Sequence, residues 1–385
     1  MDPRKWYYDR AQEGLFKSDA RRIRDELEEW FSKRKVAEKR WIWELIQNSI
    51  DCAKDRGKGT IRITVKIEGS AEDIKLVYEH DGGYFSDEDM TNLILGRSSK
   101  EDPKLAGRFA TGFIATHVLS LKVDVEGVVV NKETGERKRL RWVIDRSSKK
   151  NPKLVGTKEE IEERLRNPQI EEVEYEVPEG ARFIYHLDES SLRVAKSTIN
   201  EVCSKYMIPL VIAILNSLLG IKAYIEISLD DGKFYAYEFV DEKYENWDGL
   251  QVKIAEIDQN GQRVHIIMFE KAENVFDEDQ ESFVDRKIGL AVAKLDNKLI
   301  KLEDIPKIWC PYPLTGETEN IGLPVIVYGQ LKPNKYRETV NLDLESNRKL
   351  IGSIIRHIPN IAEYIIKNKK WINAHWLVFI KRSEV

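Results

Sequence analysis

Apolar and polar residues alternate along several separate stretches of the chain, which is the pattern of β-strands with one buried face. Two of these stretches, 60–68 (TIRITVKIE) and 73–80 (DIKLVYEH), predict paired strands joined by a turn at Gly69-Ser70. Further strands are predicted at 121–130, 139–145, 181–187, 224–229, 233–240, 251–257, 263–270 and 322–329. A turn at 133–136 follows the first of these, and the sequence Asp230-Asp231-Gly232 predicts a hairpin between the fourth and the fifth.

Helical periodicity dominates the first 56 residues and returns later in the chain. One helix is predicted over 19–34 behind a cap at Ser18-Asp19, and a second from about Ala37 to residue 55. The segment 81–107 is rich in Gly, Ser, Asp and Lys and is predicted to be a loop. Further helices are predicted at 109–120, in the apolar run that ends before Gly220, and over 350–367 around Pro359.

This order of helices and strands predicts an α+β fold in more than one domain. The length of 385 residues exceeds that of one ordinary domain. We expect an α/β sandwich with a mixed sheet in 1–200, together with its N-terminal helical segment, and a second α/β domain in 201–385.

Composition narrows the class of protein only slightly. The formal net charge of -4 gives no general attraction to nucleic acid or to anionic membranes. Three well-separated cysteines without a CxxC pair argue against a disulfide framework or a zinc site and favour a reducing cytoplasm. The longest apolar run, 207–221, is shorter than the roughly 20 residues that span a bilayer, so a buried helix is expected and no membrane.

Three polar residues occur at helical spacing in the second predicted helix. Glu44, Asn48 and Asp51 lie at positions i, i+4 and i+7, which places them on one face. An asparagine carbonyl together with phosphate oxygens suits Mg²⁺, and a carboxylate one turn away can activate a water molecule. A solvated stripe on an amphipathic helix is the alternative interpretation.

Two glycine-containing segments follow in the chain. Asp81-Gly82-Gly83 predicts a tight turn at the end of a strand, where a flat ligand can approach the backbone and a carboxylate can accept a hydrogen bond from an amino group. The segment 104–115 (KLAGRFATGFIA) places small residues before an apolar helix, whose free N–H groups can bind phosphate. The polar loop 96–100 upstream suits a lid. Ordinary surface turns and loops are the alternatives.

The order of these three segments resembles the nucleotide-binding boxes of the GHKL ATPases, the superfamily of gyrase B subunits, HtpG-type chaperones, sensor histidine kinases and MutL. The run KRWIWELIQNSIDCAKD is most similar to that of prokaryotic sacsin-like ATP-binding proteins. The resemblance covers about 40–125 and extends to about 230. It implies a Bergerat-type sandwich, ATP and Mg²⁺ as ligands, and a transducer-like second domain.

The resemblance also implies a role for each matching residue. Glu44 matches the general base, Asn48 the Mg²⁺ ligand and Asp51 the acid that supports the site. Asp81 matches the residue that binds the adenine amino group, and Gly83 the glycine beside the base. The residues matched to the lid and to the phosphate-side turn are Ser99, Lys100, Gly107, Arg108, Phe109, Ala110, Thr111, Gly112 and Phe113.

Three positions depart from the family pattern. Phe85 replaces the second glycine of the DxGxG box, and Ala110 replaces a glycine of the last box. Ala181 stands where a threonine hydroxyl usually reaches the base through water. In the second domain, Lys332 lies in a loop similar to the one that sends a lysine to the γ-phosphate, with Arg337 as the runner-up and a solvated basic loop as the alternative.

The resulting prediction is an Mg²⁺-dependent, slow ATPase that acts as a conformational switch in a prokaryotic cytoplasm, in a chaperone-like role or in an antiphage defence system. A homodimer or a complex with another protein is expected. The retained Glu44 disfavours a sensor kinase, which lacks this base. Two alternatives stay open: a DNA-processing ATPase of the MutL or topoisomerase type, which the acidic balance disfavours, and a scaffold that binds nucleotide without hydrolysing it.

Overall fold

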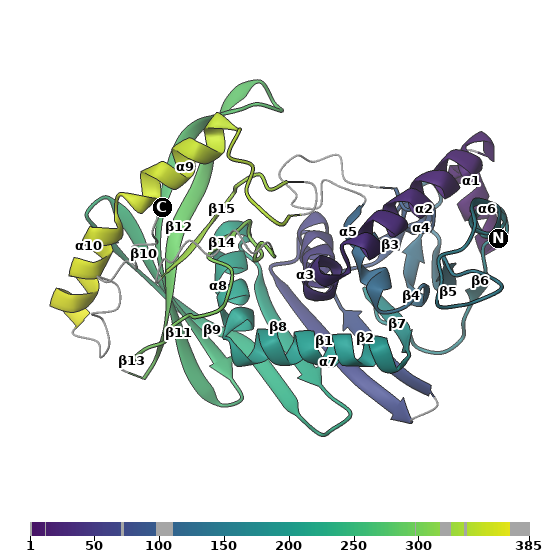
Figure 1. Ribbon diagram of the computed structural model, residues 1–385, viewed down its shortest axis with the longest axis horizontal. Helices are drawn as coiled ribbons and strands as arrows, with labels where there is room; N and C mark the ends of the chain where they lie inside the picture. Colours follow the sequence, from purple (N-terminus) through teal and green to yellow (C-terminus); the bar gives the residue numbers. More distant parts are fainter. Residues whose placement is uncertain are drawn as a thin grey trace. The chain divides into compact units, whose positions relative to one another are not determined.

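The computed structural model describes residues 2–11, 13–70, 73–97, 111–296, 298–315, 325–334 and 337–369. It is a mixed α+β protein whose strands are assigned to a 15-stranded mixed sheet. The chain divides into two compact units, Met1–Asn200 with Tyr224–Phe234, and Glu201–Ala223 with Tyr235–Val385. Figure 1 gives the labels of the elements.

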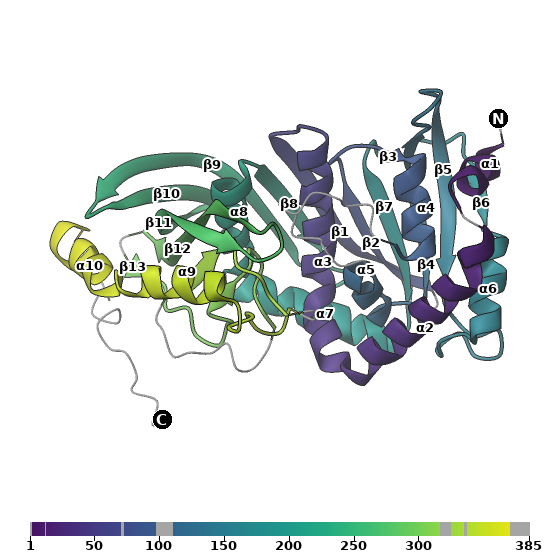
Figure 2. The ribbon, with the colours of Figure 1, turned by 90° about the horizontal axis from the view of Figure 1, so that it is seen from above.

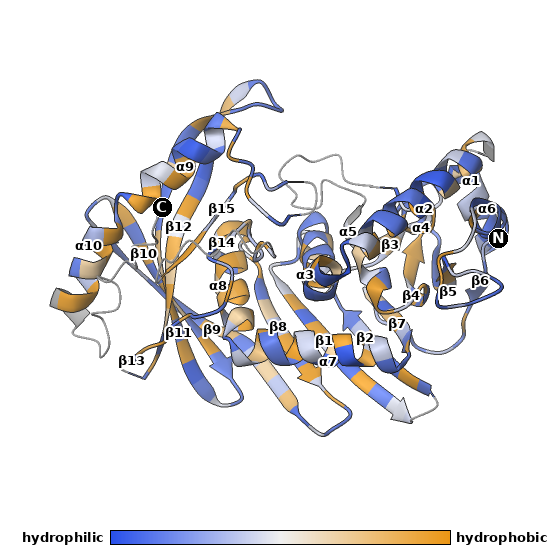
Figure 3. Ribbon diagram, in the orientation of Figure 1, coloured by the Kyte–Doolittle hydropathy of each residue, from blue (hydrophilic) through white to orange (hydrophobic). Residues whose placement is uncertain are grey.

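The first unit is built on strands that follow the spatial order β8-β1-β2-β7-β4-β5-β6. The pairs among β1, β2, β7, β4, β5 and β6 are antiparallel, and the short β3 joins β4 in parallel. In β1, Ile61, Ile63, Val65 and Ile67 are buried while the residues between them are more exposed, so one face of the sheet packs on the core. Figure 3 shows this alternation along the strands. The bounds are β1 (Thr60–Ser70), β2 (Asp73–His80), β3 (Phe85–Ser86), β4 (Lys122–Val130), β5 (Arg137–Asp145), β6 (Ile170–Glu172), β7 (Ala181–Leu187) and β8 (Lys222–Ser228).

Helices cover the apolar face of this sheet, as the view from above shows for α3, α4 and α5 (Figure 2). The long α3 is anchored by residues such as Ile42, Ile46 and Ile50, which are completely buried. Tyr7 of α1 ties the N-terminal helix to the unit by donating its hydroxyl to the backbone oxygen of Leu165, 2.7 Å away. The bounds are α1 (Pro3–Arg10), α2 (Phe16–Ser32), α3 (Arg34–Asp55), α4 (Asp87–Leu95), α5 (Thr111–Ala115), η2 (Thr116–Val118), α6 (Lys158–Arg166) and α7 (Glu189–Ser204).

The expectation of a loop from 81 onward is wrong over α4. Ser86 and Asp89 form a capping box, in which the Ser86 hydroxyl accepts from the Asp89 backbone N–H and the Asp89 carboxylate accepts from that of Ser86. At the other end, Gly96 adopts a left-handed conformation and ends the helix. A serine followed three residues later by an acidic residue is a sequence signature of a helix N-terminus. The prediction of a loop instead followed the polar composition of the segment.

The predicted cap at Ser18-Asp19 is also wrong, because α2 already begins at Phe16 after a short 3₁₀ turn, Glu13–Leu15. Asp19 lies inside the first helical turn and is nearly buried. Its carboxylate pairs with Arg97, 2.6 Å away, and with Arg22, 3.2 Å away. The aspartate therefore stabilises a tertiary ion pair between α2 and the residue that follows Gly96.

The second unit contains the strand order β14-β15-β12-β11-β10-β9. Its longest pairing joins β11 to β12, a strand that the sequence pattern did not reveal. Buried aliphatic and aromatic residues of these strands, among them Phe269, Leu290 and Val327, pack with Leu350 and Ile361 of the C-terminal helices. The bounds are α8 (Met207–Leu219), β9 (Phe234–Trp247), β10 (Leu250–Gln259), β11 (Gln262–Asp277), β12 (Ser282–Leu295), β13 (Lys298–Leu299), β14 (Ile308–Trp309), β15 (Ile326–Gly329), α9 (Glu345–Ile355) and α10 (Ile358–Glu363).

The apolar helix α8 is buried along most of its length, from Met207 to Ser217. Within the described residues no single helix is both long and apolar enough to span a membrane, and only the bent pair of α7 and α8, taken together, meets those criteria of length and composition.

Candidate active site

The polar residues predicted on α3 are not a solvated stripe. Glu44 is 3% exposed and Asp51 is 1% exposed, while Asn48 between them is half-buried. No hydrogen bond joins the Asn48 side chain to another residue in the described part of the chain. Two buried carboxylates and a more accessible carboxamide on one helix face are costly for stability alone, so the arrangement favours a binding or catalytic role.

Glu44 is held between two neighbours. The guanidinium of Arg40, one turn earlier on α3 and equally buried at 3% exposure, donates from Nη2 to Oε1 of Glu44. The backbone of Gly112 in α5 lies against the other carboxylate oxygen, so closely that a Cβ built at position 112 would overlap Oε2. The structure therefore brings the residue matched to the general base next to the turn matched to the phosphate side.

The turn after β2 packs on the same helix. A Cβ at Gly82 would lie 2.8 Å from the backbone oxygen of Ser49, and Gly83 has a φ of +125°, which favours glycine. Cys52 lies with its Sγ 3.5 Å from the backbone oxygen of Gly83. Arg56 donates from Nη2 to the backbone oxygen of Tyr84 at 3.1 Å. Successive turns of α3 thus fix the backbone of this segment.

Asp81 lies at the start of that turn and is exposed. Its Oδ1 accepts a hydrogen bond from the backbone N–H of Arg62 at 2.7 Å, and its backbone oxygen accepts from Nζ of Lys58 at 2.6 Å. Oδ2 has no hydrogen-bond partner among the described residues. One oxygen thus fixes the carboxylate to the β1 backbone, and the other is available to a ligand.

Two of the residues that depart from the family pattern, Phe85 and Ala181, are described, and both lie beside Gly127 of β4. The Phe85 ring packs edge-on against Trp142 at a centroid distance of 5.2 Å and covers Gly127, where a Cβ would lie 3.1 Å from the ring. Gly127 is paired across the sheet with the completely buried Ala181. The bulky ring of Phe85 therefore fits because the residue that faces it, Gly127, has no side chain. The residue beside Gly127 in the next strand, Ala181, is also small.

His80 supports the same turn from inside the core. Its Nδ1 accepts a hydrogen bond from the backbone N–H of Gly82 at 3.1 Å. A Cβ at Gly180 would overlap the backbone oxygen of His80, so this approach requires a glycine. Burial, together with the nearby charge of Lys58, lowers the pKa of His80 to about 3, so the imidazole is neutral at physiological pH. Nothing in the sequence pattern pointed to this role of His80.

Phe113 of α5 is half-buried, with its ring centroid 5.5 Å from that of Phe183 and 5.7 Å from that of His117. Thr111 opens α5, but its side chain is not described. The remaining residues predicted for the lid and the phosphate-side turn lie outside the described residues: Ser99, Lys100, Gly107, Arg108, Phe109 and Ala110. Their roles stay predictions.

In the second unit, the predicted phosphate-binding lysine is engaged by carboxylates. Lys332 places Nζ 2.8 Å from Asp277 at the end of β11, and 3.4 Å from Glu278 and 2.9 Å from Asp279 in the turn that follows. Arg337, the runner-up, is buried. Lys332 would have to exchange these partners for phosphate oxygens if it acts as predicted.

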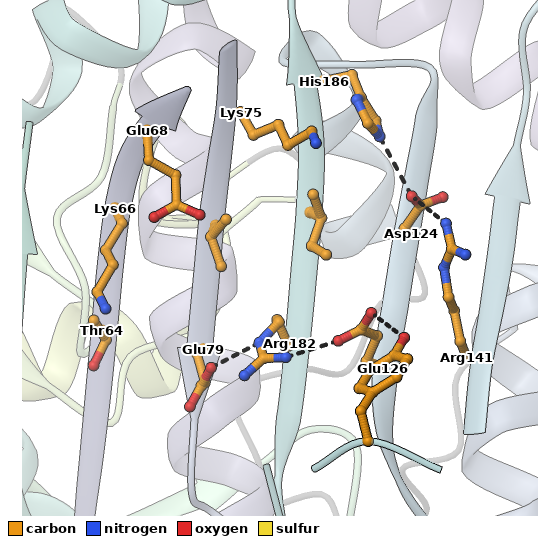
Figure 4. Close-up of a pocket in the computed structure, with 13 residues that line it drawn as sticks. Thr64, Lys66, Glu68, Lys75, Glu79, Asp124, Glu126, Arg141, Arg182 and His186 are labelled. Atoms are coloured by element: carbon orange, nitrogen blue, oxygen red, sulfur yellow. Dashed lines mark hydrogen bonds and ion pairs between the residues drawn. The ribbon is translucent and has the colours of Figure 1, made fainter. Parts of the chain in front are cut away.

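A groove of about 470 Å³ lies elsewhere in the first unit, on the sheet face opposite to the buried side chains of β1. Arg182 bridges Glu79 and Glu126 across three strands at 2.8 Å each, as Figure 4 shows. The Tyr175 hydroxyl donates to Glu126, and burial together with this carboxylate raises the tyrosine pKa to about 12. Because charges of both signs neutralise one another here, the groove has no evident catalytic group.

No family model matches the chain, and no curated protein matches it in sequence. Within the described residues, no three or more His, Cys, Asp and Glu side chains are grouped as a protein-only metal site. The donors on α3 fit Mg²⁺ bound with phosphate, because Mg²⁺ takes few protein ligands and the half-buried Asn48 offers a carbonyl oxygen.

Proposed function

We propose that the chain is an Mg²⁺-dependent ATPase of the GHKL type. In this proposal the first unit is a Bergerat-type ATP-binding sandwich and the second a transducer-like domain. The observation that carries the proposal is the buried carboxylate of Glu44 placed directly against the Gly112 backbone. Burying a carboxylate costs free energy, so a purely structural role for Glu44 would be unfavourable. A carboxylate held next to bound phosphate could instead accept a proton from water.

In this proposal the polar residues on α3 carry out ATP hydrolysis. Glu44 accepts a proton from the water molecule whose oxygen attacks the γ-phosphorus of ATP, and ADP leaves as the bond between its β-phosphate oxygen and that phosphorus breaks. Asn48 supplies an oxygen ligand to Mg²⁺, and Asp51 supports the site from the next turn. Mg²⁺ bound to the phosphates would neutralise the charge that develops during transfer. The backbone of α5 and the preceding segment receive the phosphate side of the nucleotide.

In this proposal the turn after β2 binds the adenine base. Oδ2 of Asp81 accepts a hydrogen bond from the adenine amino group, while Oδ1 remains fixed to Arg62. Gly82 and Gly83 allow the base to approach the backbone. With Ala181 in place of a threonine, no hydroxyl contributes a second contact to the base. We therefore expect weaker base selectivity than in family members that keep the threonine.

The biological role is a slow nucleotide-dependent switch, in which ATP orders the lid and changes contacts with a second copy or a partner protein. A chaperone-like role or a role in antiphage defence in the cytoplasm agrees with the sacsin-like resemblance. A DNA-processing ATPase would instead show turnover that is stimulated by DNA and falls steeply with salt.

Equilibrium binding of ATP, GTP and ADP with Mg²⁺ tests the nucleotide site. We expect ATP and ADP to bind and GTP to bind more weakly, because Asp81 would face a carbonyl oxygen in guanine instead of an amino group. Asn48→Ala should reduce the dependence of ATP binding on Mg²⁺. Equal affinity for all three nucleotides with no effect of Mg²⁺, or no binding of any of them, would reject the proposal.

A further inference from the structure

The ion pair between Arg40 and Glu44 is unusual for a helix of this kind because both partners are buried. An i, i+4 pair of arginine and glutamate is ordinarily exposed, as Arg34 and Glu38 are on the same helix. At positions 40 and 44 the two side chains are each 4% exposed. A buried pair of this type adds little net stability, so its retention on α3 requires another reason.

Arg40 restricts Glu44 from one side and α5 restricts it from the other. Oε1 of Glu44 accepts from the guanidinium, and Oε2 lies against the Gly112 backbone. These two contacts act on different oxygens, so together they fix both the position and the plane of the carboxylate. A general base works only within hydrogen-bonding reach of its water, and a displacement of about 1 Å can cost roughly 100-fold in rate.

Several titratable side chains on the elements packed against α3 are neutral or already paired. From η2, His117 is uncharged at neutral pH because burial lowers its pKa to about 4. From β2, Tyr78 is neutral and hydrogen-bonds to Ser49 at 2.7 Å. On α2, the buried Asp19 is paired with Arg22 and Arg97, and β1 presents isoleucine and valine side chains to the core.

We propose that Arg40 is a positioning residue for hydrolysis, which holds the Glu44 carboxylate in the orientation that reaches the attacking water. This inference rests on the proposed ATPase function and deepens it. Arginine suits the task because its guanidinium stays charged and offers N–H donors in a fixed plane, whereas a lysine ammonium constrains the carboxylate plane less.

The experiment compares steady-state phosphate release and ATP affinity in the full chain for the wild type, Arg40→Met, Arg40→Lys and Glu44→Gln. Arg40→Met retains the aliphatic part of the side chain and removes the guanidinium. We expect kcat to fall roughly 10- to 100-fold in Arg40→Met, with an intermediate value in Arg40→Lys. The affinity for ATP should not change, because Arg40 acts through the Glu44 carboxylate, whose proposed partner is the attacking water.

Arg34→Met is the matched control, since it removes the more exposed Arg34–Glu38 pair from the same helix, together with the hydrogen bond from Arg34 to Ser190, and should leave kcat unchanged. If Arg40→Met does not fold, the fall of kcat in Arg40→Lys at constant ATP affinity carries the test. Wild-type kcat in Arg40→Lys and in any folded Arg40→Met, beside an inactive Glu44→Gln, would overturn the role of Arg40 alone. A wild type without turnover, or full turnover in Glu44→Gln, would overturn the ATPase proposal and this inference together.

Discussion

Gly112 lies so close to Glu44 that a side chain at position 112 would overlap the Oε2 atom of the carboxylate. The two residues are 68 positions apart in the chain, counted as 112 minus 44, and belong to the first and third of the segments that resemble nucleotide-binding boxes. The requirement for glycine at 112 therefore comes from the position of the Glu44 carboxylate.

Gly112→Ala should displace the Glu44 carboxylate and lower kcat for ATP hydrolysis. Because the added methyl group has no room, the free energy of unfolding should also fall by about 1–3 kcal/mol. Phosphate release and urea unfolding measure the two effects. Gly59→Ala is the control, since nothing lies within 4 Å of a Cβ at that position. Wild-type kcat in Gly112→Ala would show that the contact with Glu44 has no role in turnover.

Asp81→Asn should weaken ATP binding while leaving the fold intact. The asparagine oxygen can still accept from the Arg62 backbone N–H, so the link to β1 is retained. The loss of the carboxylate removes a charge-assisted hydrogen bond to the adenine amino group, which we expect to reduce affinity about 10- to 100-fold. Calorimetric titration with ATP measures this. Unchanged affinity would mean that Asp81 acts only in the turn.

Lys332→Met should destabilise the second unit, most strongly at neutral pH. Burial would raise the pKa of Asp277, but the hydrogen bond from Lys332, the backbone N–H of Asp279 and Arg286 outweigh it and lower the pKa well below its usual range. A carboxyl group with a lowered pKa stabilises the fold above its unfolded pKa of about 4, and this contribution is lost as the pH falls below that value.

Urea unfolding of wild type and Lys332→Met at neutral pH and near pH 3 measures this difference. The destabilisation should be about 1–3 kcal/mol at neutral pH and smaller in acid. Lys301→Met, whose lysine pairs with the exposed Glu303, should have little effect. An equal loss at both pH values would contradict the assignment to Asp277. A normal kcat in a folded Lys332→Met would remove this lysine from the proposed catalytic residues.

His80 and His117 should make the first unit sensitive to moderate acid. Burial lowers their pKa values to about 3 and about 4, below the value of about 6.5 expected in the unfolded chain. The unfolded chain therefore binds more protons below pH 6.5, and stability is lost as the pH falls from there. The slope is about 1.4 kcal/mol per pH unit for each histidine.

His80→Asn tests this origin, because the asparagine oxygen can replace Nδ1 as the acceptor for the Gly82 N–H. Urea unfolding between pH 7 and pH 5 should show a shallower loss of stability in His80→Asn than in the wild type. Parallel pH dependences in the two proteins would show that another group causes the acid sensitivity.

The sequence predicted most of the regular elements of the first unit because strand alternation there is clear, as in β1 and β2. It failed at α4, where acidic and polar residues concealed a capping box. It also missed β12, whose buried centre reads as a continuous apolar run. The prediction for these two segments followed their composition. In the structure, the capping box makes α4 a helix, and pairing with β11 makes β12 a strand.

The sequence predicted which residues make up the candidate site, but not which neighbours they contact. The spacing of Glu44, Asn48 and Asp51 placed them on one helix face, yet whether that face is buried depends on α5 and β2, which lie elsewhere in the chain. For the same reason the sequence did not reveal that the Arg40–Glu44 pair is buried, or that the Asp81 carboxylate is fixed to Arg62. Such relationships follow from tertiary packing.

The most direct test of the central claim is single-turnover phosphate release from ATP with Mg²⁺, in the wild type and in Glu44→Gln, with ATP affinity measured for both. Glutamine keeps the size and the hydrogen-bonding oxygen of the side chain but cannot accept the proton of water. We predict that the wild type hydrolyses ATP, and that Glu44→Gln binds ATP with similar affinity and releases phosphate at least about 100-fold more slowly. Equal phosphate release by the two proteins, or no release and no binding by the wild type, would contradict the assignment of Glu44 as the base of an ATPase.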